Sequence, residues 1–80
     1  MKARVVVMPK TDVLDPQGRA VEGALHSLGF ERAGHVRIGK VIDLDLGETT
    51  AEEAQSQLTA MCENLLANTV IEDFSFELGD

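Results

Sequence analysis

The stretch HVRIGKVIDLDL, residues 35–46, decides the fold class of this 80-residue chain. Its even-numbered positions are apolar apart from Lys40, whereas most of its odd-numbered positions are polar or charged. Alternation with a period of two residues predicts a half-buried β-strand. The apolar phase runs unbroken through Gly39, so a two-residue hairpin at this point would mix the two faces.

Two arrangements preserve the phase of residues 36–46: one continuous, bent strand, or two strands joined by a three-residue turn at 39–41. We favour the continuous strand. Twelve residues would span about 40 Å, whereas the mean strand has roughly 5–6 residues. A strand of that length overhangs a small sheet, and an overhanging edge invites pairing with another chain.

Upstream, the segment LDPQGRAVEGALHSLGF (14–30) predicts a helix with its own start and stop signals. Asp15 can cap the first turn, Pro16 suits the first helical position, and Gly29 can adopt the left-handed conformation that ends a helix. The apolar stripe consists of Val21, Ala24, Leu25 and Leu28. We expect this stripe to face the core.

The remaining elements complete an α+β pattern. Residues 3–8 are apolar on both faces and predict a covered strand. A second helix begins at Thr50, with Glu53 completing a capping box, and a last strand covers residues 70–78. The expected stripe of the second helix is Ala51, Ala54, Leu58, Met61, Cys62 and Leu65. The order is βαβαβ, or βαββαβ with a turn at 39–41, and we expect one domain (1–80), a two-layer sandwich with two helices on one face of an antiparallel sheet.

The charge is divided between the two halves of the chain. Residues 1–40 hold all seven Lys and Arg against four acids, a net charge of +3. Residues 41–80 hold ten acids and no Lys or Arg, a net charge of −10. An acidic half without Trp or Tyr disfavours nucleic acid as a partner. The division favours contacts between the two halves, within one chain or between copies, or a basic protein partner for the acidic half; the alternative is a solvated acidic surface that keeps the protein soluble.

No group of residues meets the standard for a catalytic, cofactor-binding or metal site. Cys62 falls in a helix stripe and is expected to be a buried thiol, while His26 and His35 lack partners at metal-ligand spacing. Asp43 and Asp45 share a strand face and are expected to be solvated, paired with Arg37 or Lys40. The single cysteine and the short apolar run at the start favour a cytoplasmic protein that does not enter a membrane.

Three stretches closely resemble PurS, the small subunit of phosphoribosylformylglycinamidine (FGAM) synthase. They are VLDPQGRAVEGALHSLGF (13–30), VRIGKVIDLDL (36–46) and MCENLLANTVIEDFSFEL (61–78), and together they cover most of the chain. The resemblance implies a non-catalytic subunit in the fourth step of de novo purine synthesis. In this family a PurQ-type glutaminase releases ammonia, and a PurL-type synthetase uses it with ATP and Mg²⁺ to convert formylglycinamide ribonucleotide to the amidine.

The resemblance further implies that the chain forms a homodimer through its sheet, bridges the other two subunits, assists ammonia transfer and binds no cofactor itself. We expect no catalytic activity from the isolated chain. Six residues are candidate partner contacts: Leu14, Asp15, Gln17, Arg19, Arg37 and Lys40. The alternative is a small-molecule-binding regulatory module of the ACT type, which shares the βαββαβ plan; calorimetry against amino acids would distinguish the two.

Overall fold

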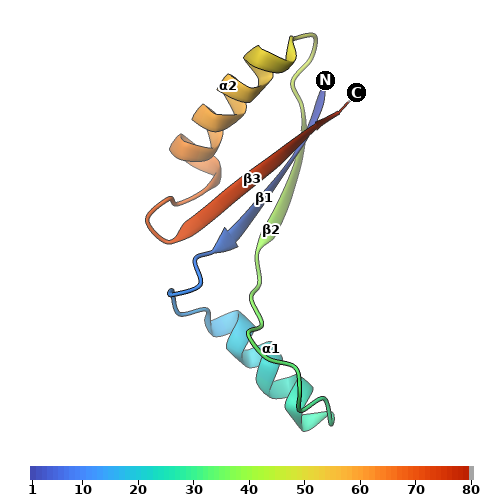
Figure 1. The fold of residues 1–80 in the computed structure, drawn as a ribbon, viewed down its shortest axis with the longest axis vertical. Helices are drawn as coiled ribbons and strands as arrows, with labels where there is room; N and C mark the ends of the chain where they lie inside the picture. Colours follow the sequence, from blue (N-terminus) through green and yellow to red (C-terminus); the bar gives the residue numbers. More distant parts are fainter. Residues whose placement is uncertain (80) are drawn as a thin grey trace.

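The computed structural model describes residues 1–79 as a three-stranded sheet, two α-helices and one turn of π-helix (Figure 1). In chain order the elements are β1 (Lys2–Pro9), α1 (Pro16–Ser27), β2 (Lys40–Asp45), α2 (Ala51–Met61), η1 (Cys62–Leu66) and β3 (Glu72–Gly79). The α+β class and the βαβαβ order are therefore confirmed. No helix among these residues is long and apolar enough to cross a membrane.

The sheet has the order β2-β1-β3, and both pairings are antiparallel. At its centre, Val5 on β1 lies between Ile42 on β2 and Phe76 on β3. Because side chains alternate along a strand, these three point to one face. Arg4 and its cross-strand partners Asp43 and Glu77 point to the other face. The central strand thus supplies the core, and β2 and β3 are both edge strands.

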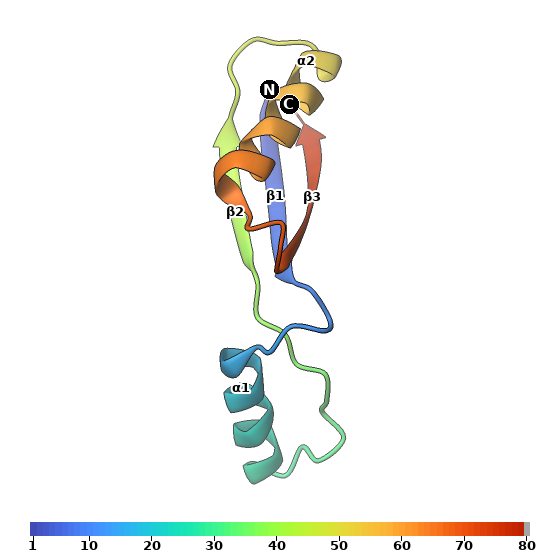
Figure 2. The same cartoon turned by 90° about the vertical axis from the view of Figure 1, so that its left-hand side faces the viewer.

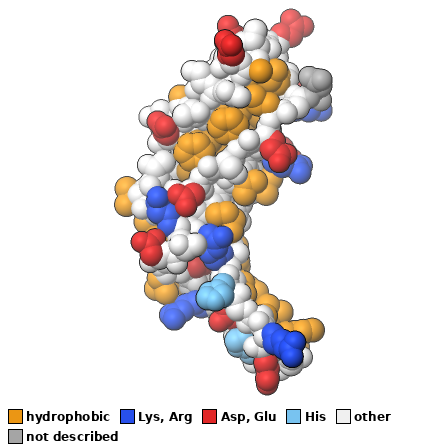
Figure 3. Space-filling model, viewed as in Figure 1, with side chains coloured by type: hydrophobic (Ala, Val, Ile, Leu, Met, Phe, Trp, Pro, Cys, Tyr) orange, Lys and Arg blue, Asp and Glu red, His pale blue; other side chains and the backbone are white. Residues whose placement is uncertain are grey.

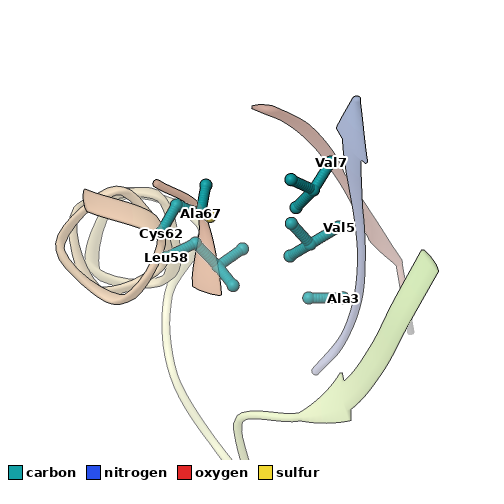
Figure 4. Close-up of a cluster of buried hydrophobic side chains, with 6 residues drawn as sticks. All are labelled: Ala3, Val5, Val7, Leu58, Cys62 and Ala67. Atoms are coloured by element: carbon teal, nitrogen blue, oxygen red, sulfur yellow. The ribbon is translucent and has the colours of Figure 1, made fainter. Parts of the chain in front are cut away.

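The core lies between β1 and the α2–η1 segment (Figure 4). Val5 and Val7 from β1, with Leu58 and Cys62 from the helical side, are the largest fully buried side chains. Ala3 and Ala67 complete the buried cluster. Small and branched side chains at these positions let the helix approach the strand closely, so one helix covers one face of the sheet.

The position of α1 differs from the expected one. Rather than lying over the sheet beside α2, α1 extends beyond the end of the sheet (Figures 1 and 2). The molecule is consequently elongated, with extents of 49 × 26 × 14 Å. Within α1 the one buried residue is Gly18, so most of the predicted stripe is not covered; Val21 and Leu28 are exposed.

The strand expected over residues 36–46 is also shorter than predicted. No turn occurs at 39–41, yet β2 begins only at Lys40, opposite Val7. The neighbouring strand β1 ends soon after Val7, at Pro9. Pro9 has no N–H to donate to a partner strand, so β2 cannot continue the pairing past this point. Residues 35–39 have no strand pairing; the Val36 N–H donates to Glu22 and the Ile38 N–H to Asp15 instead. Likewise β3 begins at Glu72 rather than at Val70.

Candidate functional site

The residues predicted to meet partners fall mainly on a projecting unit that we call the α1 arm (residues 10–39). Asp15 is the central group at the base of the arm, where the start of α1 meets the returning segment. Its Oδ1 accepts a hydrogen bond from the Gly18 N–H (3.0 Å), which caps α1 as predicted. Its Oδ2 accepts from the Ile38 N–H (2.9 Å). The bond from Ile38, then that from Gly18, holds the pKa of Asp15 below its ordinary value.

Two glycines allow the returning chain to pass close to other backbone. A Cβ on Gly18 would collide with the carbonyl oxygen of Val36 and with the Asp15 carboxylate. A Cβ on Gly39 would collide with the backbone and side chain of β1 at Val7 and Met8. A larger residue at position 18 would push the returning segment away from α1, and one at position 39 would push it away from β1.

Further hydrogen bonds connect the returning segment to the rest of the chain. Arg37 donates from Nη1 to the Pro9 carbonyl oxygen (2.9 Å), at the end of β1. Glu22 accepts from the Val36 N–H (3.3 Å), from the middle of α1. At the far end, His26 Nε2 lies 2.6 Å from the Ala33 oxygen. The arm is therefore joined along its length by contacts between residues distant in sequence.

The structure separates the six candidate contacts into two kinds. Asp15 and Arg37 are brought together at the base of the arm, where both make the structural bonds just described. Leu14 is 66% exposed, and Gln17 and Arg19 are exposed on the first turn of α1. Lys40 is exposed at the start of β2. A role for any of them in partner contact stays a prediction.

Sequence reasoning missed the apolar surface of the arm. Leu28 is 73% exposed, and Val21 and Phe30 are also exposed, although the first two were predicted to face a core. Periodicity reveals that a helix has an apolar face but not what covers that face. Phe30 could have indicated this apolar surface, because it is an aromatic residue directly after the end of the helix. The helix ends at Gly29, which has a φ of 99°.

The uncovered face of the sheet is charged. Arg4 donates to Asp43 through Nε (2.8 Å) and Nη2 (3.1 Å), and this pair lowers the pKa of Asp43. The strand register places these two residues opposite each other, with Glu77 on the far side of Arg4. The expected pairing of Asp43 with Arg37 or Lys40 is therefore wrong, because the strand register places Arg4 directly opposite Asp43.

Cys62 is buried as predicted, and its burial, followed by the nearby Glu63, raises the pKa of its thiol. Residues 1–79 contain no group of three His, Cys, Asp or Glu side chains placed to hold a metal ion. The exposed features include the apolar arm, the charged sheet face and the two acids Glu52 and Glu53 in the first turn of α2, all of which suit contact with proteins.

Comparison with known proteins supplies the family. Residues 2–80 match the family described as "PurS: Phosphoribosylformylglycinamidine (FGAM) synthase". The chain belongs to the PurS family. The phosphoribosylformylglycinamidine synthase subunit PurS of Bacillus subtilis is 47% identical over 79 residues, which cover 99% of this chain and 93% of that protein.

Solved structures of the PurS family share the fold described above. A structure of B. subtilis PurS is similar to this chain with a TM-score of 0.87 and 46% identity, covering 99% of this chain and 98% of that one. A chain in the structure of PurLQS from Thermotoga maritima is similar with a TM-score of 0.84 and 29% identity, covering 95% and 93% respectively. High scores over nearly the whole chain include the projecting arm, which is thus part of the shared fold.

Proposed function

We propose that this chain is the non-catalytic subunit of FGAM synthase, bridging a PurQ-type glutaminase and a PurL-type synthetase and assisting the transfer of ammonia between them. The observation that carries the proposal is membership of the PurS family along residues 2–80, together with the similarity to a chain of the PurLQS structure. The elongated shape supports it, because a body 49 Å long presents well-separated surfaces to two partners.

In this role the chain contributes binding surfaces, and the reacting groups belong to its partners. ATP and Mg²⁺ would be used by the complex, with no cofactor held by this chain. The arm, bearing Leu14, Gln17 and Arg19, is the candidate contact with one partner. We place the complex in the cytoplasm, consistent with the single, buried thiol at Cys62.

The test compares two nitrogen sources in a reconstituted complex, with and without this chain. Bulk ammonia reaches the synthetase without a docked glutaminase, whereas ammonia released from glutamine by an undocked one is diluted. Turnover with glutamine should therefore fall far more than turnover with ammonium salt when the chain is omitted. Equal glutamine-dependent rates with and without it would contradict bridging, and an equal loss on both nitrogen sources would indicate a structural effect on the synthetase.

We also propose that the chain is a homodimer paired through β2. This strand is at an edge of the sheet, and Val41 on it is exposed. Sedimentation should show a dimer at micromolar concentration, and Val41→Lys should weaken it because charged side chains oppose edge pairing. Val70→Lys, at an exposed position outside β2, is the matched control and should leave the dimer intact. A stable wild-type monomer would contradict the proposal.

A further inference from the structure

A stretch of chain longer than β2 lies between two residues with a left-handed backbone conformation. His35 has a φ of 53°, and Gly47 has a φ of 73°. Residues 36–46, between them, carry the alternating side chains seen in the sequence, although β2 itself begins only at Lys40. The chain continues from the start of β2 past the end of β1 (Figure 2). Val41 is the midpoint of the stretch, six residues from either bound.

The backbone of this stretch forms hydrogen bonds on one side. The Val36 and Ile38 N–H groups both donate to the arm. The Leu46 N–H donates to the Met1 carbonyl oxygen (2.8 Å), just before β1. Because backbone N–H groups alternate between the two sides of an extended chain, those of the odd-numbered residues 37–45 point the opposite way. That side is the free edge of the sheet, since β2 is an outer strand.

A second copy of the chain can pair with this edge in few ways. A two-fold dimer uses the same edge of both copies, and the two strands then run antiparallel. An axis perpendicular to the sheet keeps equal faces on the same side, so opposite residues must differ by an even number of positions. One residue therefore lies on the axis, opposite its own copy, and it determines every other pair.

The side chains favour Val41 as the residue on the axis. With Lys40 or Asp43 on the axis, two like charges would lie directly opposite each other, which is destabilising. With Gly39 or Ile42 there, the stretch would pair with itself over a shorter length, because its midpoint is Val41.

With Val41 on the axis, opposite charges face each other and apolar side chains face each other. Arg37 lies opposite Asp45 of the second copy, and this pair occurs twice in the dimer. Ile38, which is 38% exposed in the single chain, lies opposite Leu44 of the second copy. Both basic and acidic side chains reach the surface along the length of the molecule (Figure 3), so the alignment of two copies decides which charges meet.

Arg37 and Asp45 can both form an additional bond. Arg37 donates to the Pro9 carbonyl oxygen through Nη1, and Asp45 contacts the Gly47 N–H and the N-terminal amine through Oδ1. The guanidinium has further N–H donors, and the carboxylate has a second oxygen. Within one chain the two residues are eight positions apart, about 26 Å along an extended strand, so they can pair only between copies.

We propose that the free edge from Arg37 to Asp45 binds the same edge of a second copy, with Val41 on the two-fold axis and Arg37 paired with Asp45 across the interface. This inference rests on the homodimer proposed above, and it names the register of that dimer and the residues that select it. The unpaired backbone groups supply the hydrogen bonds of the interface, and the two charge pairs exclude other alignments.

The first experiment uses two charge-reversed variants, Arg37→Glu and Asp45→Arg. Each alone places two like-charged pairs in its dimer, and its dissociation constant, measured by sedimentation at low salt, should rise at least about tenfold. An equimolar mixture forms a dimer with one native pair and one reversed pair, and its affinity should return to within about threefold of the wild type. Mixing would not repair damage within a single chain.

Lys40→Glu is the matched control for these variants. It reverses a charge in the same strand, but in this register Lys40 lies opposite the apolar Ile42 of the second copy. Its dissociation constant should stay within about twofold of the wild type.

The second experiment locates the axis by cross-linking, in a Cys62→Ala background. Val41→Cys places two thiols on the axis, where the Cα atoms of a hydrogen-bonded pair are about 5.5 Å apart, within the range of a disulfide. Oxidised glutathione should therefore cross-link this variant into a covalent dimer. Asp43→Cys should remain uncross-linked, because its two copies are offset by four residues, about 13 Å along the strand.

The expected result is recovery of affinity on mixing together with cross-linking of the Val41→Cys variant. A dimer that shows no recovery, or that cross-links in the Asp43→Cys variant instead, would overturn this register while leaving the homodimer through β2 intact. A wild-type chain that stays monomeric at micromolar concentration would overturn the homodimer and the register together. Neither outcome alters the bridging role, which the comparison of nitrogen sources tests separately.

Discussion

The carboxylate of Asp15 accepts a hydrogen bond from the backbone N–H of Ile38, 2.9 Å away and 23 residues later in the chain. The same carboxylate caps α1 through Gly18. One side chain therefore starts the helix and fixes the returning segment beside it. Asp15 thus closes the base of the arm, while Arg37, which donates to the Pro9 carbonyl oxygen, connects the arm to β1.

Replacing Asp15 with asparagine should loosen the arm in a pH-dependent way. The pKa of Asp15 is lower in the folded chain than its ordinary 3.8, so its contribution to stability is present above that value and is lost as the pH falls through the folded pKa. The difference in thermal midpoint between wild type and Asp15→Asn should thus be largest near neutral pH and shrink in acid. A difference that is independent of pH would show that the charge is not involved.

Two glycines of α1 should respond in opposite directions to alanine. Gly18→Ala places a Cβ against Val36 and Asp15, and we expect a loss of about 1–3 kcal/mol in the free energy of unfolding. Gly23→Ala meets nothing within 4 Å and should stabilise the helix by about 0.5–1 kcal/mol. Urea unfolding measures both, and a neutral Gly18→Ala would contradict the close passage of the returning segment.

Two leucines, Leu58 in α2 and Leu65 in η1, should differ in their importance for stability. Leu58→Ala removes a fully buried side chain and should cost about 2–5 kcal/mol in the free energy of unfolding. Leu65→Ala changes an exposed side chain and should remain within about 0.5 kcal/mol of the wild type. A large cost for Leu65→Ala in the isolated chain would show that η1 is a regular helical turn in solution.

Cys62 should be slow to react with thiol reagents in the folded chain. Burial raises its pKa and restricts access, so alkylation should require unfolding and should accelerate with added urea. Cys62→Ala should alter packing modestly and leave the activity of the reconstituted complex unchanged. Loss of glutamine-dependent turnover on this substitution, with the fold intact, would contradict a structural role.

Much of the fold was predictable because local signals were strong. Asp15 and Pro16 start α1, Thr50 caps α2 by accepting from the Glu53 N–H (3.2 Å), and Gly29 ends α1. Each signal acts within one turn of helix, and neighbouring residues in the sequence supply it. The alternation in residues 35–46 likewise predicted a strand without a turn, although only its second half pairs.

The errors arise where distant parts of the chain meet. The end of β1 at Pro9 limits the length of β2, and this limit cannot be read from residues 35–39 themselves. The same holds for Asp43, whose partner Arg4 is set by strand register. Leu65 left its predicted stripe because one wide turn changes the phase of the helix, and no residue type signals such a turn.

The elongated shape has a thermodynamic consequence. The accessible surface is 5873 Å², whereas a folded monomer of this mass is expected to expose about 4,700 Å². The excess is comparable to the roughly 800 Å² that each partner contributes to a standard interface. A single copy of the chain therefore exposes to water more surface than a compact protein of the same mass would expose. Its melting temperature should therefore rise with its own concentration and with that of its partners, by mass action.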